Sequence, residues 1–289
     1  MRKRGSSKTA ELAVMTRALA THSRYASTVM DDPYANCFLG SATLIPYLFN
    51  RFFMAVNPFF WRMGINSVGF LIALCRHRFM SDLMRSCRDE NIRQIVLIGA
   101  GYDTNFLRDP DYYKDTSLFE IDHPNTQSRK IRLIRKHSLE SNPGIIYIGA
   151  DLVHDSIQDQ LYEKGLDRRE AVLIIAEGVL SYLSLHSLDR LYHSLSSLSV
   201  KVRLAADYRL PQMNEKNVSL VIKRWRKEFE LMNEQYRSFF SEQDMEQKLT
   251  QHGFQVVSHH NLAQLWEEYS GDKAPRHLHT IAGLFVSEN

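Results

Sequence analysis

The chain has 289 residues, of which 44% are hydrophobic and 24% are charged, and its formal net charge is +3. This length fits one large α/β domain or one domain with a cap, and a chain of this composition can bury a core without disulfides or metals. Such a small charge gives no argument for a nucleic-acid partner, and three cysteines without C-x-x-C spacing predict a reduced, cytoplasmic protein.

The first third of the chain shows helical patterns. Helices are predicted over Lys8–His22, over Pro33–Phe38 and over two apolar segments between about Leu44 and Cys87. Arg51 and Arg62 interrupt the apolar stretch, so it lacks the roughly 20 consecutive apolar residues of a membrane span. The basic start also lacks the apolar core of a secretory signal. We therefore expect residues 1–90 to form a helical lid packed on the core, without stable membrane insertion.

From residue 91 onward, short apolar strands alternate with helical patterns. Strands are predicted over Gln94–Ile98, Ser117–Ile121, Ile145–Ile148, Ala171–Ala176, Val202–Ala206, Phe254–Ser258 and Thr280–Val286. The clearest helices are predicted over Asn125–His137, Asp155–Glu163, Leu185–Leu198 and Glu242–Gln251, the last with Ser241 and Asp244 in a capping box. This alternation predicts an α/β fold across residues 91–289: a doubly wound, Rossmann-like sheet of seven strands, with a helical insertion at about 212–240 over the carboxyl ends of the strands.

Two glycines follow the first predicted strand. Gly99 and Gly101 would let the backbone turn tightly and approach a ligand where a Cβ atom would collide. The dinucleotide fingerprint has a third glycine where Thr104 stands, which counts against NAD because its pyrophosphate needs a closely approached helix N-terminus. S-adenosylmethionine has no phosphate and tolerates this position. An NAD-dependent oxidoreductase remains the alternative from a different enzyme class.

Acidic residues end the next three predicted strands. Glu120 and Asp122 point the same way on their strand, and either could accept hydrogen bonds from ribose hydroxyls, although Asp122 could instead cap a helix. Asp151 could accept from an adenine amino group while Leu152 covers the ring, or it could be a helix cap. Glu177 leaves an apolar strand and needs a cationic partner, such as the amino acid end of a cofactor. Together these residues predict one cofactor site at one rim of the sheet.

The same segments resemble the leucine carboxyl methyltransferase family and its bacterial relatives. The similar motifs are the GAG-x-DT turn at Gly99–Thr104, F-E-I-D-H-P at Phe119–Pro124 followed by Arg129 and Lys130, Gly149–Leu152, Ala176–Leu183, and near the start Ser23–Ala26 and Asp32–Tyr34. The resemblance covers roughly Thr9 to Leu198 well and the last third loosely. It implies the fold of the class I S-adenosylmethionine-dependent methyltransferases, with S-adenosylmethionine as the cofactor.

The resemblance also implies roles for single residues. Those implied to bind the cofactor are Arg76 at its carboxylate, with Arg78 as the nearby alternative, Gly99 with Gly101 and Asp103 of the same turn at its backbone, Asp122 at the ribose, Asp151 and Leu152 at the adenine, and Glu177 at its amino end. Tyr182 and Arg24 are implied to face the methyl acceptor. Histidine pairs such as His259 and His260 form no metal set with a cysteine, so we expect no metal.

The leading hypothesis is an O-methyltransferase that acts on a carboxylate or a hydroxyl of an apolar small molecule. A carboxylate is already nucleophilic, whereas a hydroxyl needs a general base, for which Tyr182, His123 and His154 are candidates. A protein C-terminal carboxyl methyltransferase is the close variant, but Val153 and Ser23 replace an arginine and a lysine of the family pattern. A protein that senses the cofactor without turnover is a further alternative. The sequence predicts neither the acceptor nor the oligomeric state.

Overall fold

The computed structural model describes residues 7–23, 26–56, 68–87, 89–139, 144–215, 218–231 and 235–289. Its strands are β1 (Gln94–Ile98), β2 (Ser117–Asp122), β3 (Ile145–Gly149), β4 (Val172–Ala176), β5 (Val202–Arg209), β6 (Gln255–Asn261) and β7 (Ala282–Glu288). Its α-helices are α1 (Lys8–Thr21), α2 (Ser41–Val56), α4 (Val68–Ser86), α5 (Asn105–Arg108), α6 (Pro124–Lys136), α7 (Ile157–Glu163), α8 (Leu185–Ser196), α9 (Leu220–Leu231), α10 (Glu242–Thr250) and α11 (Leu262–Ser270). Four short 3₁₀ helices are η1 (Ala35–Phe38), η2 (Leu180–Tyr182), η3 (Pro211–Asn214) and η4 (Arg276–Thr280).

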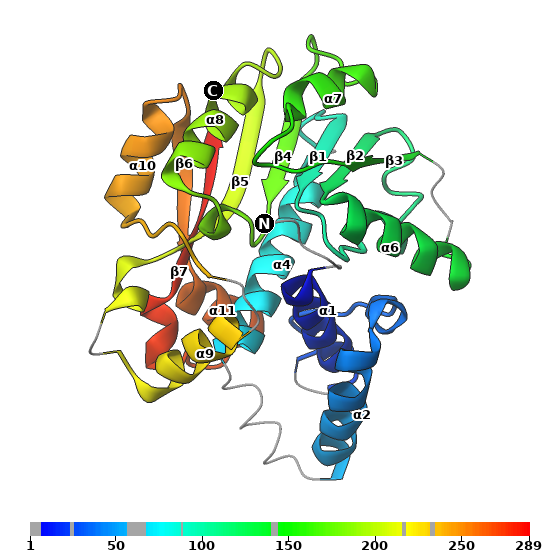
Figure 1. The fold of residues 1–289 in the computed structure, drawn as a ribbon, viewed down its shortest axis with the longest axis vertical. Coiled ribbons are helices and arrows are strands. Elements are labelled where there is room, and N and C mark those ends of the chain that lie inside the picture. The colour runs from blue at the N-terminus through cyan, green and yellow to red at the C-terminus, as the bar shows by residue number, and fades with distance from the viewer. Residues whose placement is uncertain are drawn as a thin grey trace.

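All seven strands form one sheet in the order β3-β2-β1-β4-β5-β7-β6, flanked by helices on both faces (Figure 1). Strands β1 to β5 run parallel to one another, and β7 runs antiparallel to β5 and β6. The predicted doubly wound, Rossmann-like fold is therefore confirmed. The strand order reverses between β1 and β4, and in open α/β sheets the crevice at such a point holds the ligand. A ligand site is therefore expected at the carboxyl ends of β1 and β4.

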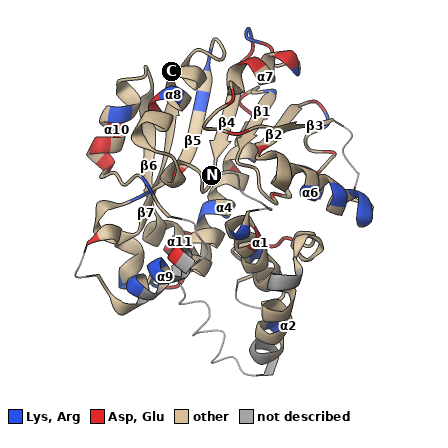
Figure 2. Ribbon diagram, viewed as in Figure 1, with Lys and Arg blue, Asp and Glu red and all other residues tan. Residues whose placement is uncertain are grey.

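The inner strands are apolar because both of their faces are covered. Every residue of β1 and β4 is buried, and alternate residues of β1 belong to two separate cores, Ile95 and Leu97 to one, Val96 and Ile98 to the other. Most charged residues lie on helices and loops, and the strands are largely uncharged (Figure 2). A charged side chain at the end of an inner strand therefore stands in apolar surroundings and needs a partner.

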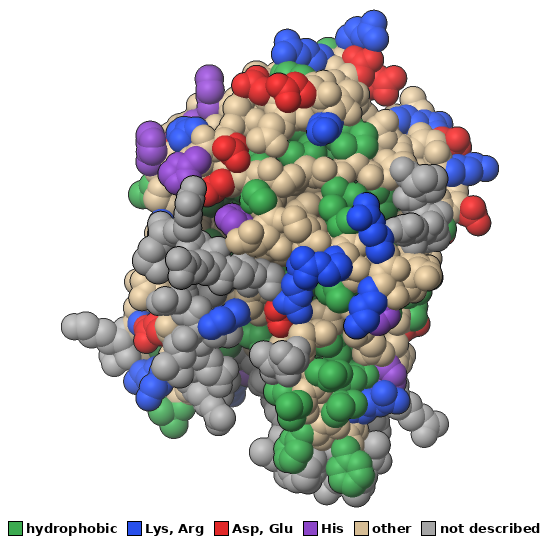
Figure 3. Space-filling model, turned by 45° about the vertical axis from the view of Figure 1, so that its right-hand side comes forward, with side chains coloured by type: hydrophobic (Ala, Val, Ile, Leu, Met, Phe, Trp, Pro, Cys, Tyr) green, Lys and Arg blue, Asp and Glu red, His purple; other side chains and the backbone are tan. Residues whose placement is uncertain are grey.

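Helices α1, α2, α9 and α11 lie on the side of the sheet toward which β1 and β4 point (Figure 1). The predicted amphipathic segment begins with α2, whose surface carries exposed apolar side chains at the lower end of the molecule (Figure 3): Leu44, Ile45, Leu48, Phe49 and Phe52. Arg62 lies outside the described residues. None of the helices in the described part of the chain combines the length and the apolar character that a bilayer crossing requires. The division at residue 90 stays a prediction.

The structure corrects the sequence prediction in the last third of the chain. Helix α11 was not predicted, although Asn261 caps its first turn by accepting from the backbone N–H of Ala263 and Gly271 ends it with a φ of 72°. The last strand was predicted to begin at Thr280, but that residue closes η4 and β7 begins at Ala282. The capping box of Ser241 and Asp244 at α10 is confirmed.

Strand β2 carries a buried ion pair. Lys130 of α6 donates from Nζ to Oε2 of Glu120, and both side chains are completely or almost completely buried. Burial raises the pKa of Glu120 to about 7, although Lys130 acts to lower it. The two carboxylates that the sequence left as alternatives for the ribose therefore have different neighbours: Glu120 faces α6, and Asp122 faces the glycine turn.

This ion pair makes a stability prediction. Lys130→Met should lower the free energy of unfolding by about 3 kcal/mol near pH 8, because it leaves Glu120 buried without a countercharge. The pKa of Glu120 is raised in the folded chain, so folding favours the neutral acid, and the stability from this group is lost as the pH rises through about 7. The loss in Lys130→Met should therefore be smaller near pH 5. Urea denaturation at both pH values measures it.

The matched control is the double variant Glu120→Gln/Lys130→Met, which removes both charges. It should recover most of the stability lost by Lys130→Met and should show little extra pH dependence. Equal losses at pH 5 and pH 8 in Lys130→Met would contradict the assignment of the effect to a buried carboxylate.

Candidate functional site

The turn after β1 has a backbone conformation that glycine alone adopts easily. Gly99 and Gly101 have φ values of +67° and +51°. A Cβ atom on Gly99 would lie 2.4 Å from Cγ2 of Val179, which follows β4. The ends of β1 and β4 are therefore packed against each other at the point where the strand order reverses. Any side chain at residue 99 would push them apart.

Asp122 joins the end of β2 to this turn. Its Oδ2 accepts from the backbone N–H of Gly101 at 2.6 Å, and its Oδ1 accepts from the N–H of His123 at 2.6 Å. Burial raises the pKa of Asp122, and these two N–H groups act to lower it. The N-cap of α6 is His123, whose Nδ1 accepts from the N–H of Asn125. The alternative in which Asp122 is the helix cap is therefore wrong.

Helix α1 holds the same turn from the other side. Nη2 of Arg17 donates to the carbonyl oxygen of Tyr102 at 2.6 Å, and its Nε donates to Oδ2 of Asp32 at 2.8 Å. Thr104 donates to the same carboxylate oxygen at 2.8 Å, and Asp32 is completely buried. Asp32 begins the D-P-Y motif, for which no role was predicted. Its place in the structure is to link the N-terminal segment to the glycine turn.

Arg76 and Glu177 form a buried ion pair beside the turn. Nε of Arg76, on α4, donates to Oε1 of Glu177 at 2.9 Å. Burial acts to raise the pKa of Glu177, but His77 and Arg76 more than offset it and lower the pKa to about 2. Glu177 is therefore a carboxylate at neutral pH. Arg78, the nearby alternative, pairs with Asp82 in a partly exposed contact on the other side of α4 and does not join this group.

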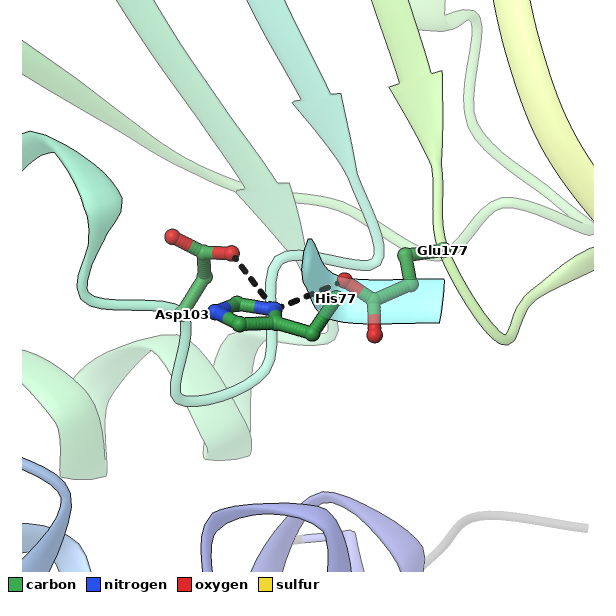
Figure 4. A group of neighbouring side chains, drawn as sticks. All are labelled: His77, Asp103 and Glu177. Atoms are coloured by element: carbon green, nitrogen blue, oxygen red, sulfur yellow. Dashed lines mark hydrogen bonds and ion pairs between the residues drawn. The ribbon is translucent and has the colours of Figure 1, made fainter. Parts of the chain in front are cut away.

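His77 was not predicted as a site residue. Its Nδ1 lies 2.9 Å from Oε2 of Glu177 and 3.6 Å from Oδ2 of Asp103, so the imidazole lies between the two carboxylates (Figure 4). Asp103 is also held by Asn105, which donates to it from its backbone N–H and its side-chain amide. Ligand atoms of these three side chains lie within 4.8 Å of one another, a spacing that a metal ion could use. The sequence prediction had considered only other histidines.

Asp207 and Arg209, at the end of β5, extend the group and were also missed. Asp207 accepts from Nη1 of Arg76 at 3.3 Å and from Nη1 of Arg209 at 2.8 Å, and the backbone N–H of Gly178 donates to its other oxygen. The strand was predicted to end at Ala206, one residue before this pair. A D-x-R pattern directly after an apolar strand was the signal that could have revealed it.

Aromatic side chains surround Arg209. Its guanidinium carbon lies 5.1 Å from the ring centroid of Tyr236 and 5.8 Å from that of Trp225. The ring of Tyr182 is 5.1 Å from that of Tyr236. Tyr182, predicted to face an acceptor, therefore adjoins the aromatic residues of the insertion. Arg24, the other predicted acceptor residue, lies outside the described residues.

Asp151 and Leu152 follow β3 on the same rim. Oδ1 of Asp151 accepts from the N–H of Val153 at 2.9 Å, and the N-cap of α7 is Ser156, so Asp151 caps no helix. Leu152 is partly buried against one of the two cores. His154 is exposed. The structure thus places Asp151 and Leu152 at the third strand end, apart from the ion pairs at β4 and β5.

Solved structures share this fold. A Thermobifida fusca protein assigned as a methyltransferase superposes with a TM-score of 0.58 at 12% identity, over 88% of this chain and 92% of that one. A Streptomyces avermitilis protein superposes with a TM-score of 0.57 at 13% identity, over 74% of this chain and 82% of that one. At these identities the likeness concerns the fold alone.

Curated sequences show a nearer relation. A Mycolicibacterium smegmatis protein is 29% identical over 196 residues, which are 66% of this chain and 63% of that protein. A Streptomyces coelicolor protein is 34% identical over 140 residues, 46% of each chain. Both are assigned as S-adenosyl-L-methionine-dependent methyltransferases. The chain matches less than two thirds of the length of these relatives.

The family model for leucine carboxyl methyltransferases matches residues 10–196, more than half of the chain. The match contains Arg76, Gly99, Asp122 and Glu177, and it ends before Asp207 and Arg209. The motifs that suggested this resemblance lie within it. The chain belongs to the leucine carboxyl methyltransferase family.

Proposed function

We propose that the protein is an S-adenosylmethionine-dependent O-methyltransferase that transfers a methyl group to a carboxylate or a hydroxyl of an apolar small molecule. The observation that carries the proposal is the buried pair of Arg76 and Glu177 beside the glycine turn. The amino acid end of S-adenosylmethionine carries a carboxylate and an ammonium group, which complement this pair. Family membership and the relatives' assignments support the same cofactor.

The residues present fit this cofactor at each strand end. Arg76 would hold the carboxylate and Glu177 the ammonium group, beside the turn that Gly99 and Gly101 form with their positive φ values. Asp122 would accept from the ribose, and Asp151 with Leu152 would contact the adenine. Asp103 is proposed as part of the same turn. When bound, the cofactor supplies an electrophilic methyl group on a sulfonium.

The chain itself would then contribute positioning and exclusion of water. A carboxylate acceptor is a nucleophile at neutral pH, so it needs orientation and no general base. Tyr182 and the aromatic side chains of the insertion would form the wall on the acceptor side, and residues 1–90 the lid. Of the three candidate bases, His154 is exposed and His123 caps a helix, so a hydroxyl acceptor would have Tyr182 alone as its base, whereas a carboxylate acceptor needs none. A protein ending in leucine would use the same chemistry.

The first turn of the sheet disfavours an NAD-dependent oxidoreductase. The helix after β1 is α5, which has only 4 residues. Thr104 stands where the dinucleotide fingerprint has its third glycine, and its hydroxyl is bound to the buried Asp32. A pyrophosphate therefore lacks the long, closely approached helix N-terminus that usually binds it.

The cofactor is tested by thermal melts with S-adenosylhomocysteine and, separately, with NAD. S-Adenosylhomocysteine at about 100 times its dissociation constant should stabilise the protein by roughly 2.7 kcal/mol, a rise in melting temperature of several degrees. NAD should cause no shift. A shift with NAD and none with S-adenosylhomocysteine would reverse the proposal.

The assignment of the cofactor's amino acid end is tested by substitutions. Arg76→Ala and Glu177→Ala should each weaken S-adenosylhomocysteine binding more than tenfold, a cost of at least about 1.4 kcal/mol, measured by calorimetry. Arg78→Ala is the matched control, because Arg78 lies on the same helix and pairs outside the site. It should leave the affinity within about threefold of the parent, a difference of roughly 0.7 kcal/mol. Unchanged affinity in both Arg76→Ala and Glu177→Ala would remove them from the site.

A further inference from the structure

The guanidinium of Arg209 is buried and has unused donors. The residue is 3% exposed, and among the described residues its one hydrogen-bond acceptor is Asp207, which Nη1 reaches. Its Nε is buried and meets no acceptor within the described part of the chain. An arginine carries five N–H donors in a planar fork, and buried donors without partners cost free energy. An arginine with these properties is suited to a ligand that brings acceptor atoms.

The surroundings of Arg209 fit one chemical class of ligand. Tyr236 and Trp225 lie against the guanidinium, so an acceptor atom there would be attached to an apolar or aromatic body. Tyr236 also lines a neighbouring cavity of about 140 Å³, close to the size that holds a benzene ring, about 150 Å³. Arg209 does not line this cavity, whose other lining residues are Met213, Asn214, Arg226, Glu230, Gln235 and Phe239. A planar carboxylate is the group that the arginine fork binds with two parallel hydrogen bonds.

The position of Arg209 links it to the reaction proposed above. Asp207 is paired with both Arg209 and Arg76. Arg209 therefore lies next to the arginine that is proposed to hold the cofactor's carboxylate. Burial acts to lower the pKa of Arg209, but Tyr236 and Asp207 more than offset it, so the group stays charged.

We propose that Arg209, with Tyr236 and Trp225, forms the subsite for the carboxylate of an apolar, aromatic acid that accepts the methyl group. This inference rests on the proposed function and narrows its acceptor from carboxylate or hydroxyl to carboxylate. Arg209 belongs to β5 and the aromatic residues belong to the insertion, so both lie beyond the segment that matches the family model. The subsite is accordingly a feature of this chain's own last third.

The test compares acids with their amides on the full-length protein saturated with S-adenosylhomocysteine. Benzoate and phenylacetate are titrated by calorimetry beside benzamide and phenylacetamide, which have the same body without the charge. The parent protein should bind the acids and discriminate against the amides by at least tenfold. Arg209→Met should lose at least tenfold in acid affinity, and Arg209→Lys should recover part of it, because lysine keeps the charge without the fork. The matched control is Arg237→Met, since Arg237 is an exposed cation that follows Tyr236 in the insertion.

The readouts separate the possible failures. The affinity for S-adenosylhomocysteine is measured in every variant and tests the proposed function. If the parent protein does not bind S-adenosylhomocysteine, both the proposed function and the subsite are wrong. If the parent binds S-adenosylhomocysteine but neither acid, or if Arg209→Met binds the acids as the parent does, the subsite is wrong and the proposed function stands. A merely structural role for Arg209 would lower stability and weaken acids and amides alike, and this outcome also overturns the subsite.

Discussion

Glu177 follows an apolar strand, and it carries a charge there only because α4 brings Arg76 and His77 to it. Burial alone would raise the pKa of this carboxyl, and His77 and Arg76 reverse that effect. Arg76 in turn depends on Asp207, which the N–H of Gly178 and the guanidinium of Arg209 also hold. Because a single unpaired charge at such a depth costs several kcal/mol, these groups are stable only as a set. The set fixes α4 against the ends of β4 and β5.

The glycine turn is fixed by an independent set of contacts. Val179 fills the space where a side chain on residue 99 would stand, Asp122 holds the N–H of Gly101, and Arg17 holds the carbonyl of Tyr102. Burial acts to raise the pKa of Asp32, but Arg17 and Arg108 more than offset it, so Asp32 is a charged partner for Arg17. The N-terminal helix is therefore bonded to the turn and does not simply rest on it. The N-terminal segment and the glycine turn are thus held together as one unit.

The strands and the acids at their ends could be predicted from sequence because the signals are local. The short apolar run at Gln94–Ile98 predicted both ends of β1 correctly. The acidic residues at the ends of β2, β3 and β4 could be found because they come at or directly after the predicted strand ends. The choice between Glu120 and Asp122 could not be made, because it depends on Lys130, which reaches Glu120 only after α6 packs on the sheet. The roles of Asp32 and His77 were missing for the same reason: each depends on a partner far away in the chain.

Asp207 and Arg209 were missed for a different reason. Polar residues usually mark the end of a buried strand, so the prediction stopped at Ala206, whereas β5 continues to Arg209 because the two charges satisfy each other and Arg76. Helix α11 was missed although its cap residues are visible in the sequence, because the strand before it is only partly buried and obscures the start of the helical pattern. In β5, ion pairing with a distant helix extended the strand beyond the point where the local sequence predicts its end. In α11, the weak pattern of the preceding strand hid the start of the helix.

The ion pair of Arg76 and Glu177 affects which ligands can bind beside the glycine turn. Arg76 and Glu177 neutralise each other in the structure, so a ligand can separate them only by replacing both partners. A ligand with a carboxylate alone would leave Glu177 with His77 but without Arg76, and an amine alone would leave Arg76 with Asp207 but without Glu177, so either ligand would lose one ion-pair contact. An amino acid end brings both charges at once and restores the balance. Under the proposed function, the same ion pair that stabilises the free protein therefore selects a zwitterion, and Asp207 keeps Arg76 in place while the exchange occurs.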